Sequence, residues 1–400
     1  MFKKALLAAA VATAATGVQA KTPTLEELYE LVQAQQAEIQ RLKGQLGETE
    51  AKVEKTDAKV EATADALEKG TGSYAANDGA WYNKTSLGGY GEHHYNHFDS
   101  DSGKTDQVDA HRFVLFVGHE FNDKLRFFSE LELEHSLSGE GKPGEVELEQ
   151  AYIEYDFAQN HSAQIGQFLI PVGIINETHE PDTFYGVERN NVEKNIIPAT
   201  WWETGVQVKG ELAPGLSYNL AVHSGLATDD AGKIRGGRQK SAKANAEDFA
   251  YTGRIKYTGI QGLELAATVQ YQEDVTQDLF GQNDAMLYEA HAVYQFDAFK
   301  FTGLWAKWDI DGLSFEDAGR DEQEGWYVEG AYKVTDKLGL FVRESAWDNN
   351  AGNSADTETR QFDYGINYWL ADNVVLKADV ANQRGAGKAD AFNLGVGWSF

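Results

Sequence analysis

Cysteine is absent from this chain of 400 residues, and proline and methionine are scarce, at 6 and 2 residues. The lack of cysteine excludes disulfides, thiolate metal sites and cysteine nucleophiles, and it suits passage through an oxidising compartment. Basic residues are a minority, because 35 Lys and Arg stand against 63 Asp and Glu, for a formal net charge of −28. Nucleic-acid binding needs a basic face, so we expect no nucleic-acid partner.

Long hydrophobic runs are also missing, and no segment approaches the ~20 consecutive apolar residues of a membrane helix. The apolar stretch Ala5–Ala15 is too short to span a bilayer, and two lysines precede it. Val18-Gln19-Ala20 then fits a small-x-small cleavage site. This pattern predicts a secretory signal peptide over residues 1–20, so the mature chain is expected to be exported.

Glycine and aromatic residues are abundant, with 40 Gly, 18 Tyr, 20 Phe and 9 Trp. At the C-terminus, small or polar residues alternate with the apolar residues Phe392, Leu394, Val396, Trp398 and Phe400. This period of two predicts a strand with one face toward lipid and one toward water. The barrel-assembly machinery of bacterial outer membranes reads such terminal strands, so Trp398 and Phe400 are predicted to be an assembly signal.

Residues 81–400 contain alternating runs of this kind at a spacing of about 20 residues. They predict an all-β fold, a transmembrane antiparallel barrel of about sixteen strands, with fourteen or eighteen as alternatives. Short connections alternate with long ones, as tight periplasmic turns and large external loops would. The short set is 121–124, 213–215, 259–262, 334–337 and 370–373, and the long set is 99–107, 171–199, 226–246, 274–283, 311–323 and 348–357. Sixteen strands would enclose a water-filled lumen and no packed core.

Residues 21–69 are predicted to form a periplasmic coiled-coil oligomerisation segment, joined to the barrel by a linker over residues 70–80. The apolar a positions recur every seven residues without a break, from Leu25 to Leu67. This stripe has no partner within the chain, so self-association is expected, although the pattern does not decide between dimer and trimer. The alternatives are a single solvated helix or a disordered spacer.

The longest connection follows the sequence Gly166–Pro171 and ends at Trp201 and Trp202, which we expect in an aromatic girdle facing lipid. The GQF-x-x-P strand end, this long loop, the WWETG strand start, the coiled coil and the terminal Phe400 resemble the phosphate-selective porins O and P. The resemblance implies a trimeric porin of sixteen strands in the outer membrane. We expect no cofactor. Leu169 stands where many members of that family have lysine.

Strand parity assigns side chains to the lumen if the apolar face of each strand meets lipid. The predicted lumen wall is mixed and slightly acidic, which favours a broad or cation-leaning pore, whereas selection of phosphate would need a ladder of basic residues. The basic wall candidates are Arg112, Arg126, Arg254, Lys256, Lys300 and Arg343, and the acidic ones are Glu130, Glu132, Glu134 and Asp363.

The third long loop supplies the predicted pore constriction. If this loop folds inward, its acids would face its basic residues and create a transverse field, whereas an external flap would leave these charges in water. The candidates are Glu177, His179, Glu180, Asp182, Arg189 and Lys194. A basic cluster in the next long loop would recruit anions, bind lipopolysaccharide phosphate or simply meet water: Lys233, Arg235, Arg238, Lys240 and Lys243.

The favoured function is passive diffusion of small hydrophilic solutes or ions, and the chain is not expected to be an enzyme. A phosphate- or anion-selective channel is the main alternative, and an envelope tether held by the coiled coil is a second one. Strand parity separates His94 from His93 and His97, which argues against a metal site made of these three histidines. The expected partners are outer-membrane lipid, lipopolysaccharide, the barrel-assembly machinery and two further copies of the chain.

Overall fold

The computed structural model describes residue 36 and residues 81–136, 141, 143–229, 232–279, 281–387 and 389–400. The predicted signal peptide lies outside the described residues, as do the linker over 70–80 and, apart from residue 36, the coiled coil. No helix in the described part of the chain is long and apolar enough to cross a membrane.

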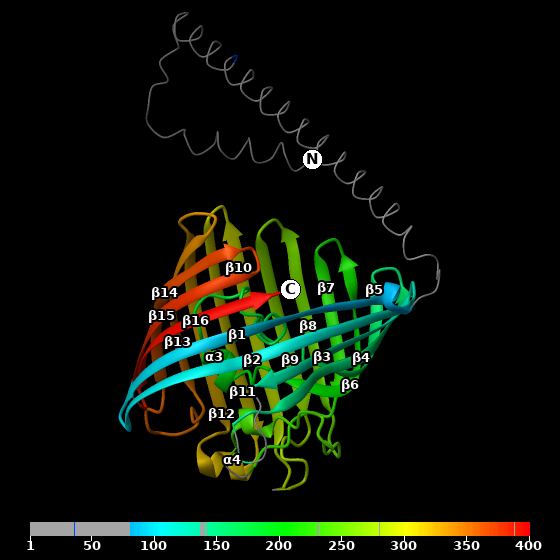
Figure 1. Ribbon diagram of the computed structural model, residues 1–400. Coiled ribbons are helices and arrows are strands. Elements are labelled where there is room, and N and C mark those ends of the chain that lie inside the picture. Colours follow the sequence, from blue (N-terminus) through cyan, green and yellow to red (C-terminus); the bar gives the residue numbers. More distant parts are fainter. Residues whose placement is uncertain are drawn as a thin grey trace, which may run out of the picture. The chain divides into compact units, whose positions relative to one another are not determined.

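Sixteen antiparallel strands close into a barrel, so the predicted fold and strand number are confirmed (Figure 1). Each strand pairs with its neighbours in the sequence, and the first strand pairs with the last. Four short helical segments accompany them: η2 (Trp81–Lys84), α3 (Val192–Asn195), η3 (Ile234–Gly237) and α4 (Leu313–Ala318). The strands are β1 (Thr85–Ser100), β2 (Gly103–Asn122), β3 (Leu125–Glu134), β4 (Val146–Ala158), β5 (His161–Leu169), β6 (Trp202–Ala213), β7 (Leu216–His223), β8 (Ala250–Ile260), β9 (Leu263–Gln272), β10 (Asp284–Phe296), β11 (Phe299–Asp311), β12 (Glu322–Lys333), β13 (Leu338–Asp348), β14 (Thr359–Ala371), β15 (Val374–Gly385) and β16 (Ala389–Ser399).

The two faces of the barrel wall follow the alternation in the sequence. In β14, Phe362, Tyr364 and Ile366 are exposed on the outer face, whereas Asp363 and Asn367 are buried toward the interior. Successive side chains of a strand point to opposite faces, and each face meets a different surrounding. The outer face is apolar and aromatic, and the inner face is polar and charged.

The strand connections differ between the two ends of the barrel. The short-turn end carries tight connections such as 123–124, 159–160 and 214–215, and the long-loop end carries the long ones. The long loop predicted over 99–107 is wrong, because only residues 101–102 separate β1 from β2. This hairpin is polar and lacks the apolar alternation of a membrane strand, but its ladder continues and is supported by cross-strand bonds from Tyr95 and His97 to Asp106.

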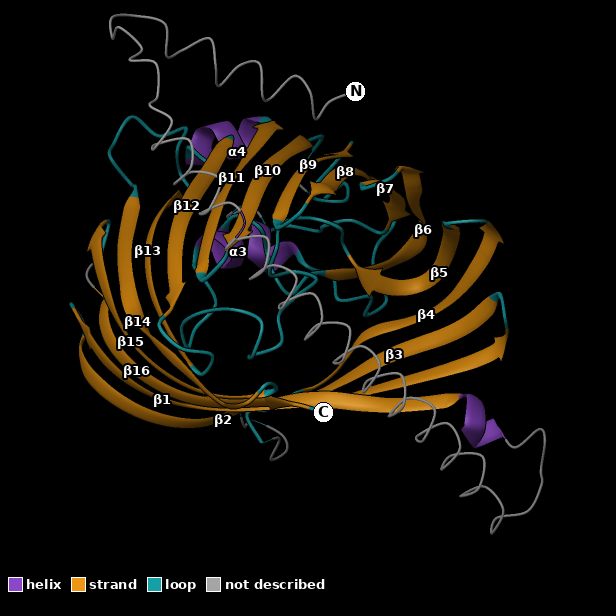
Figure 2. Cartoon of the chain, turned by 90° about the horizontal axis from the view of Figure 1, so that it is seen from above, coloured by secondary structure: helices purple, strands orange, loops and turns teal. Residues whose placement is uncertain are grey.

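Part of the interior is a packed apolar core, which differs from the predicted water-filled lumen. The third loop, here residues 170–201, lies with α3 inside the ring of strands (Figure 2). Ile196 and Trp201 of this loop pack against the inner face of β10, β11 and β12, where Trp308 contacts Trp201 with ring centroids 6.4 Å apart. The predicted lipid-facing girdle at Trp201 and Trp202 is wrong, because both side chains are buried. Their burial follows from the inward fold of the loop that precedes them.

Candidate pore constriction

The third loop begins with a turn organised by one buried carboxylate. Glu193 of α3 accepts hydrogen bonds from the backbone N–H groups of Ile174 (2.7 Å) and Ile175 (2.6 Å), and from the hydroxyl of Tyr327 (2.9 Å). Gly173 precedes this turn with φ +69°, and a Cβ there would lie 2.6 Å from Glu193 Oε2. Glycine is therefore required at this position both for its backbone angle and for the approach of the carboxylate.

His179 attaches the loop to the wall made by β3 and β4. Its Nε2 lies 3.3 Å from Glu130 Oε1 and 3.5 Å from Glu149 Oε2, and all three side chains are buried. Burial opposes the charged imidazolium, but the hydrogen bonds to Glu130 and Glu149 raise the pKa of His179 to about 10. His179 is thus a charged anchor of the loop, with no free face toward a solute.

The next part of the loop reaches strands near the closing seam of the barrel. The N–H of Val187 donates to Asp379 of β15 at 2.6 Å. Glu188 accepts from Asn96 of β1 at 2.9 Å and contacts His94 Nδ1 at 3.1 Å. Burial raises the pKa of Glu188, but its bond with His94 outweighs this effect and lowers the pKa to about 2. The loop therefore contacts the wall at β3, β4, β1 and β15 after leaving β5.

Three further predicted constriction residues lie at separate positions along the loop. Glu177 pairs with Arg254 of β8, which also donates to Asn219 at 2.9 Å. Asp182 accepts from the hydroxyl of Ser399 at 2.8 Å. Glu180 is half-buried, and its backbone carbonyl accepts from the Thr183 hydroxyl at 2.7 Å.

The remaining two candidates are the basic residues Arg189 and Lys194. Arg189 donates to the carbonyl of His179 at 3.3 Å, and Lys194 is exposed. Both line a cavity of about 480 Å³ at the long-loop end, together with Arg235. The six predicted residues thus do not form one ring, because Glu177 lines a different cavity of about 840 Å³ at the short-turn end.

The ten predicted wall residues all lie on strands whose charged side chains face the interior, and most of their charges are paired. Arg112 contacts Glu92 (2.8 Å) and Glu132 (3.3 Å), and Arg343 contacts Glu329 (3.2 Å) and Asp363 (3.0 Å). The other five pairs are Arg126 with Glu154, Arg126 with Asp156, Arg254 with Glu177, Lys256 with Glu264 at 3.3 Å, and His179 with Glu130. Glu134 lines the 480 Å³ cavity, and Lys300 lines a third cavity of about 270 Å³.

Arg343 lines both the 480 Å³ cavity and the 270 Å³ cavity. Asn190 of the third loop lines the smaller of these two spaces, and its neighbours Arg189 and Asn191 line the larger one. Arg343 on β13 and the loop near residue 190 thus border both cavities.

The basic cluster predicted in the loop between β7 and β8 contacts the third loop. Arg235 donates to the carbonyls of Lys194 and Ala199, and Arg238 donates to the carbonyl of Thr200. Lys240 pairs with Glu147 of β4. Arg235 and Arg238, two of the five residues, therefore bind backbone carbonyls at the end of the third loop.

Sequence reasoning missed Glu149 and Asn367, two wall residues that receive the loop, and it did not predict the contact of Asp379 with the loop or the role of Glu193. Asp379 and Val187 are 192 positions apart in the chain. Nothing local in the sequence marks such a pair, and only the inward strand parity of the wall residues could have placed them among the candidates.

A closed antiparallel barrel of sixteen strands, with a long loop folded inside and cavities on both sides of this loop, defines the chain as a porin of the outer membrane. Residues 89–393 match the family described as phosphate-selective porin O and P, and the chain belongs to this family. The family and the fold are those of a channel rather than of an enzyme.

The similarity to other proteins extends over most of the chain. An uncharacterized protein of Aquifex aeolicus (strain VF5) is 29% identical over 350 residues, which are 79% of this chain and 80% of the relative. An anion-selective porin from Comamonas acidovorans has a TM-score of 0.59 at 12% identity, with 79% of this chain and 99% of that porin covered. OmpT of Vibrio cholerae, an outer membrane protein in its trimer form, has a TM-score of 0.54 at 13% identity, with the same coverage. These two solved structures share the fold of this chain.

Proposed function

We propose that this porin lets small hydrophilic solutes and ions diffuse passively through a lumen narrowed by the third loop. The observation that supports this function is the path of that loop, which leaves β5 and contacts β1 and β15 through Glu188 and Val187. The cavities on its two sides are large enough for hydrated ions and small polar molecules. The charged and polar walls replace part of the hydration shell of a passing solute.

We infer that the pore has a broad or cation-leaning selectivity. The basic side chains Arg112, Arg126, Arg254 and Arg343 are paired with carboxylates, so a phosphate ion would have to displace these partners. The 480 Å³ cavity is lined by seven carboxylates and five Arg or Lys residues. A lumen with an excess of negative charge raises the local concentration of cations.

An anion-selective pore is the second candidate, and one feature favours it. Arg189, Lys194 and Arg235 line the same cavity, and within the described residues the Nε of Arg189 is buried without a hydrogen-bond partner. An anion entering this cavity would satisfy that donor. The family description and the anion-selective porin of Comamonas acidovorans agree with this alternative.

The reversal potential of the purified protein in a planar bilayer under a KCl gradient tests both candidates. We expect a reversal potential displaced toward that of K⁺, and no fall in conductance when phosphate is added. Conductance that phosphate blocks, with the block lost in the double variant Arg189→Gln/Lys194→Gln and kept in Lys337→Gln, would instead establish the anion-selective pore. Lys337 serves as the control because it lies in a turn at the short-turn end. A folded barrel that conducts no ions would contradict the diffusion function itself.

We also propose that the chain is exported with residues 1–20 removed, and that residues 21–69 form a periplasmic coiled coil that favours a homotrimer. The trimer form of OmpT, which shares the fold, supports this assembly. Deletion of residues 21–69 is expected to leave the conductance of each barrel unchanged and to reduce the cross-linked trimer. Outer membrane that detaches from the envelope, with trimers retained, would support the tether instead.

The remaining partners in our proposal are outer-membrane lipid and lipopolysaccharide around the apolar outer face, and the barrel-assembly machinery. Trp398 and Phe400 are proposed as the residues that this machinery reads.

A further inference from the structure

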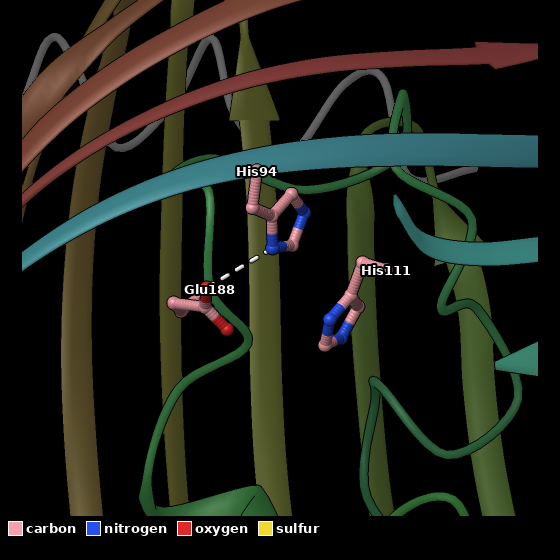
Figure 3. Close-up of side chains that lie close together, drawn as sticks. All are labelled: His94, His111 and Glu188. Atoms are coloured by element: carbon pink, nitrogen blue, oxygen red, sulfur yellow. Dashed lines mark hydrogen bonds and ion pairs between the residues drawn. The ribbon is translucent and has the colours of Figure 1, made fainter. Parts of the chain in front are cut away.

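Two histidines and one carboxylate meet on the wall of the 480 Å³ cavity, brought together from three segments (Figure 3). His94 comes from β1, His111 from β2 and Glu188 from the third loop. The two imidazole rings are stacked with their centroids 4.4 Å apart, and His94 Nδ1 lies 3.1 Å from Glu188 Oε1. One ligand atom from each of the three side chains lies within 4.8 Å of the others.

Each of the two imidazoles also contacts a further carboxylate. His111 Nδ1 lies 2.9 Å from Asp109 Oδ2, which also contacts His135 Nδ1 at 2.8 Å. His94 Nε2 lies 3.0 Å from Glu92 Oε2. A carboxylate bonded to one nitrogen of a histidine fixes the ring and directs the other nitrogen toward a metal ion, which is the usual outer-shell arrangement of histidine metal ligands. In this arrangement Nδ1 of His94 is the nitrogen that faces Glu188.

Both nitrogens of His94 face carboxylates, Glu92 on one side and Glu188 on the other. A divalent cation bound between His94 and Glu188 would take the place of the contact between Nδ1 and Glu188.

We propose that His94, His111 and Glu188 form a binding site for a divalent transition-metal cation of the Zn²⁺ class. Two imidazoles and one carboxylate match the ligands of Zn²⁺ sites that keep a fourth position open for water. Tetrahedral coordination at about 2.0–2.1 Å places the ligand atoms about 3.3 Å apart, so the two stacked rings would have to turn out of their parallel arrangement to bind one ion. Hard cations such as Mg²⁺ prefer oxygen ligands, and the two imidazoles discriminate against them.

The charges around the site are compatible with a cation. Arg112, Arg189, Lys194 and Arg235 line the same cavity, but Arg112 is already paired with Glu92 and Glu132. The carboxylates of the cavity outnumber its Arg and Lys residues by seven to five. Because Glu188 belongs to the third loop and the histidines to the wall, the metal ion would tie the loop to β1 and β2. The prediction that metal binding lowers the conductance rests on the proposed function, whereas the prediction that the metal binds does not.

Isothermal titration of the purified full-length protein with ZnCl₂ tests the binding. We expect one high-affinity site in the wild type. The variants His94→Gln, His111→Gln and Glu188→Gln are each expected to lose more Zn²⁺ affinity than the roughly 10- to 100-fold that is typical when an outer-shell partner is replaced. Asp109→Asn is expected to fall within that outer-shell range. The matched controls are His93→Gln and His97→Gln on the same strand, because His93 packs against Trp398 and His97 pairs with Asp106. Neither control should change the affinity.

Heat-modified migration on gels identifies variants that fail to fold, and Glu188→Gln keeps the test valid if a strand variant fails, because it changes only the loop. Unchanged Zn²⁺ affinity in folded Glu188→Gln and His94→Gln would overturn the proposal. Equal competition by Mg²⁺ would overturn it too, because a diffuse acidic field would then explain the binding.

Bilayer recordings with and without micromolar Zn²⁺ test the effect on the channel. We expect a reversible fall in wild-type conductance that EDTA restores and that His111→Gln lacks. Zn²⁺ binding in the calorimeter without any change in conductance would overturn the link between the loop and the pore. A barrel that does not conduct even without Zn²⁺ would instead contradict the proposed function, and the calorimetric result would still decide the site.

Discussion

At the scale of single residues, the interior is dominated by charges that neutralise one another in pairs. His179 is the most buried example in the third loop, between Glu130 and Glu149. Its ring centroid lies 5.9 Å from that of Tyr90, and its backbone carbonyl accepts a hydrogen bond from Arg189. Buried pairs of this kind do little for stability compared with an apolar contact, but removal of one partner leaves an uncompensated charge. The pair therefore makes the anchored position of the loop specific.

His179→Gln is expected to destabilise the anchored loop by about 3–5 kcal/mol, because Glu130 and Glu149 lose their cation. The measurement is the open-channel current noise in a planar bilayer, combined with the rate at which a protease cuts the loop. Both should increase in the variant and remain at the wild-type level in His119→Gln, which lies near the short-turn end.

The same anchor predicts a dependence on pH. The pKa of His179 is raised to about 10 from the ordinary value of 6.5, so its stabilisation is complete below pH 6.5 and is lost as the pH rises through about 10. The current noise of the wild type should thus stay low up to pH 8 and increase near pH 10. Noise in His179→Gln should be high throughout, and noise with the same profile in both proteins would refute the anchor.

At the scale of elements, the sequence predicted the strands well because period-two alternation is a local property. The turns over 121–124, 213–215 and 370–373 were placed correctly for the same reason. The error at 99–107 shows the limit, since a strand that extends beyond the membrane no longer needs an apolar face. Its hydrogen bonds to the neighbouring strand hold it, and these depend on register rather than on composition.

The third loop shows a second limit of sequence reasoning. The sequence singled out its charged residues as a set, but Glu177, His179 and Lys194 end in three different surroundings. Each position depends on a wall residue far away in the sequence, such as Arg254 for Glu177. The apolar residues of the loop, Ile196 and Trp201, also needed a partner that local patterns do not reveal, the inner face of β11 with Trp308.

At the scale of the whole molecule, the barrel depends on one closing seam between β1 and β16. The N–H of Gly89 donates to the carbonyl of Phe400 at 3.0 Å, and the N–H of Phe400 donates to the carbonyl of Gly89 at 2.9 Å. The Phe400 ring stacks near Phe113 on the outer face. The last residue thus contributes to the seam as well as to the proposed assembly signal.

Phe400→Ala separates these two roles. The backbone bonds of the seam do not need the ring, so the variant refolded in detergent is expected to form a barrel with a melting temperature close to that of the wild type. In cells, the amount of folded protein in the outer membrane should fall severalfold because the assembly signal is lost. Phe392→Ala is the control, since it removes another exposed outward ring from β16, the strand that Phe400 follows. An equal loss in both variants would contradict a special role for the terminal residue.

The seam also makes the first strand depend on the last one. Strands β2 to β15 each pair with the strands before and after them in the sequence, whereas the second edge of β1 is satisfied only by β16. A chain truncated before β16 would therefore remain an open sheet with two bare edges, which favour aggregation and degradation. Loss of the C-terminal strand thus exposes an edge at each end of the sheet.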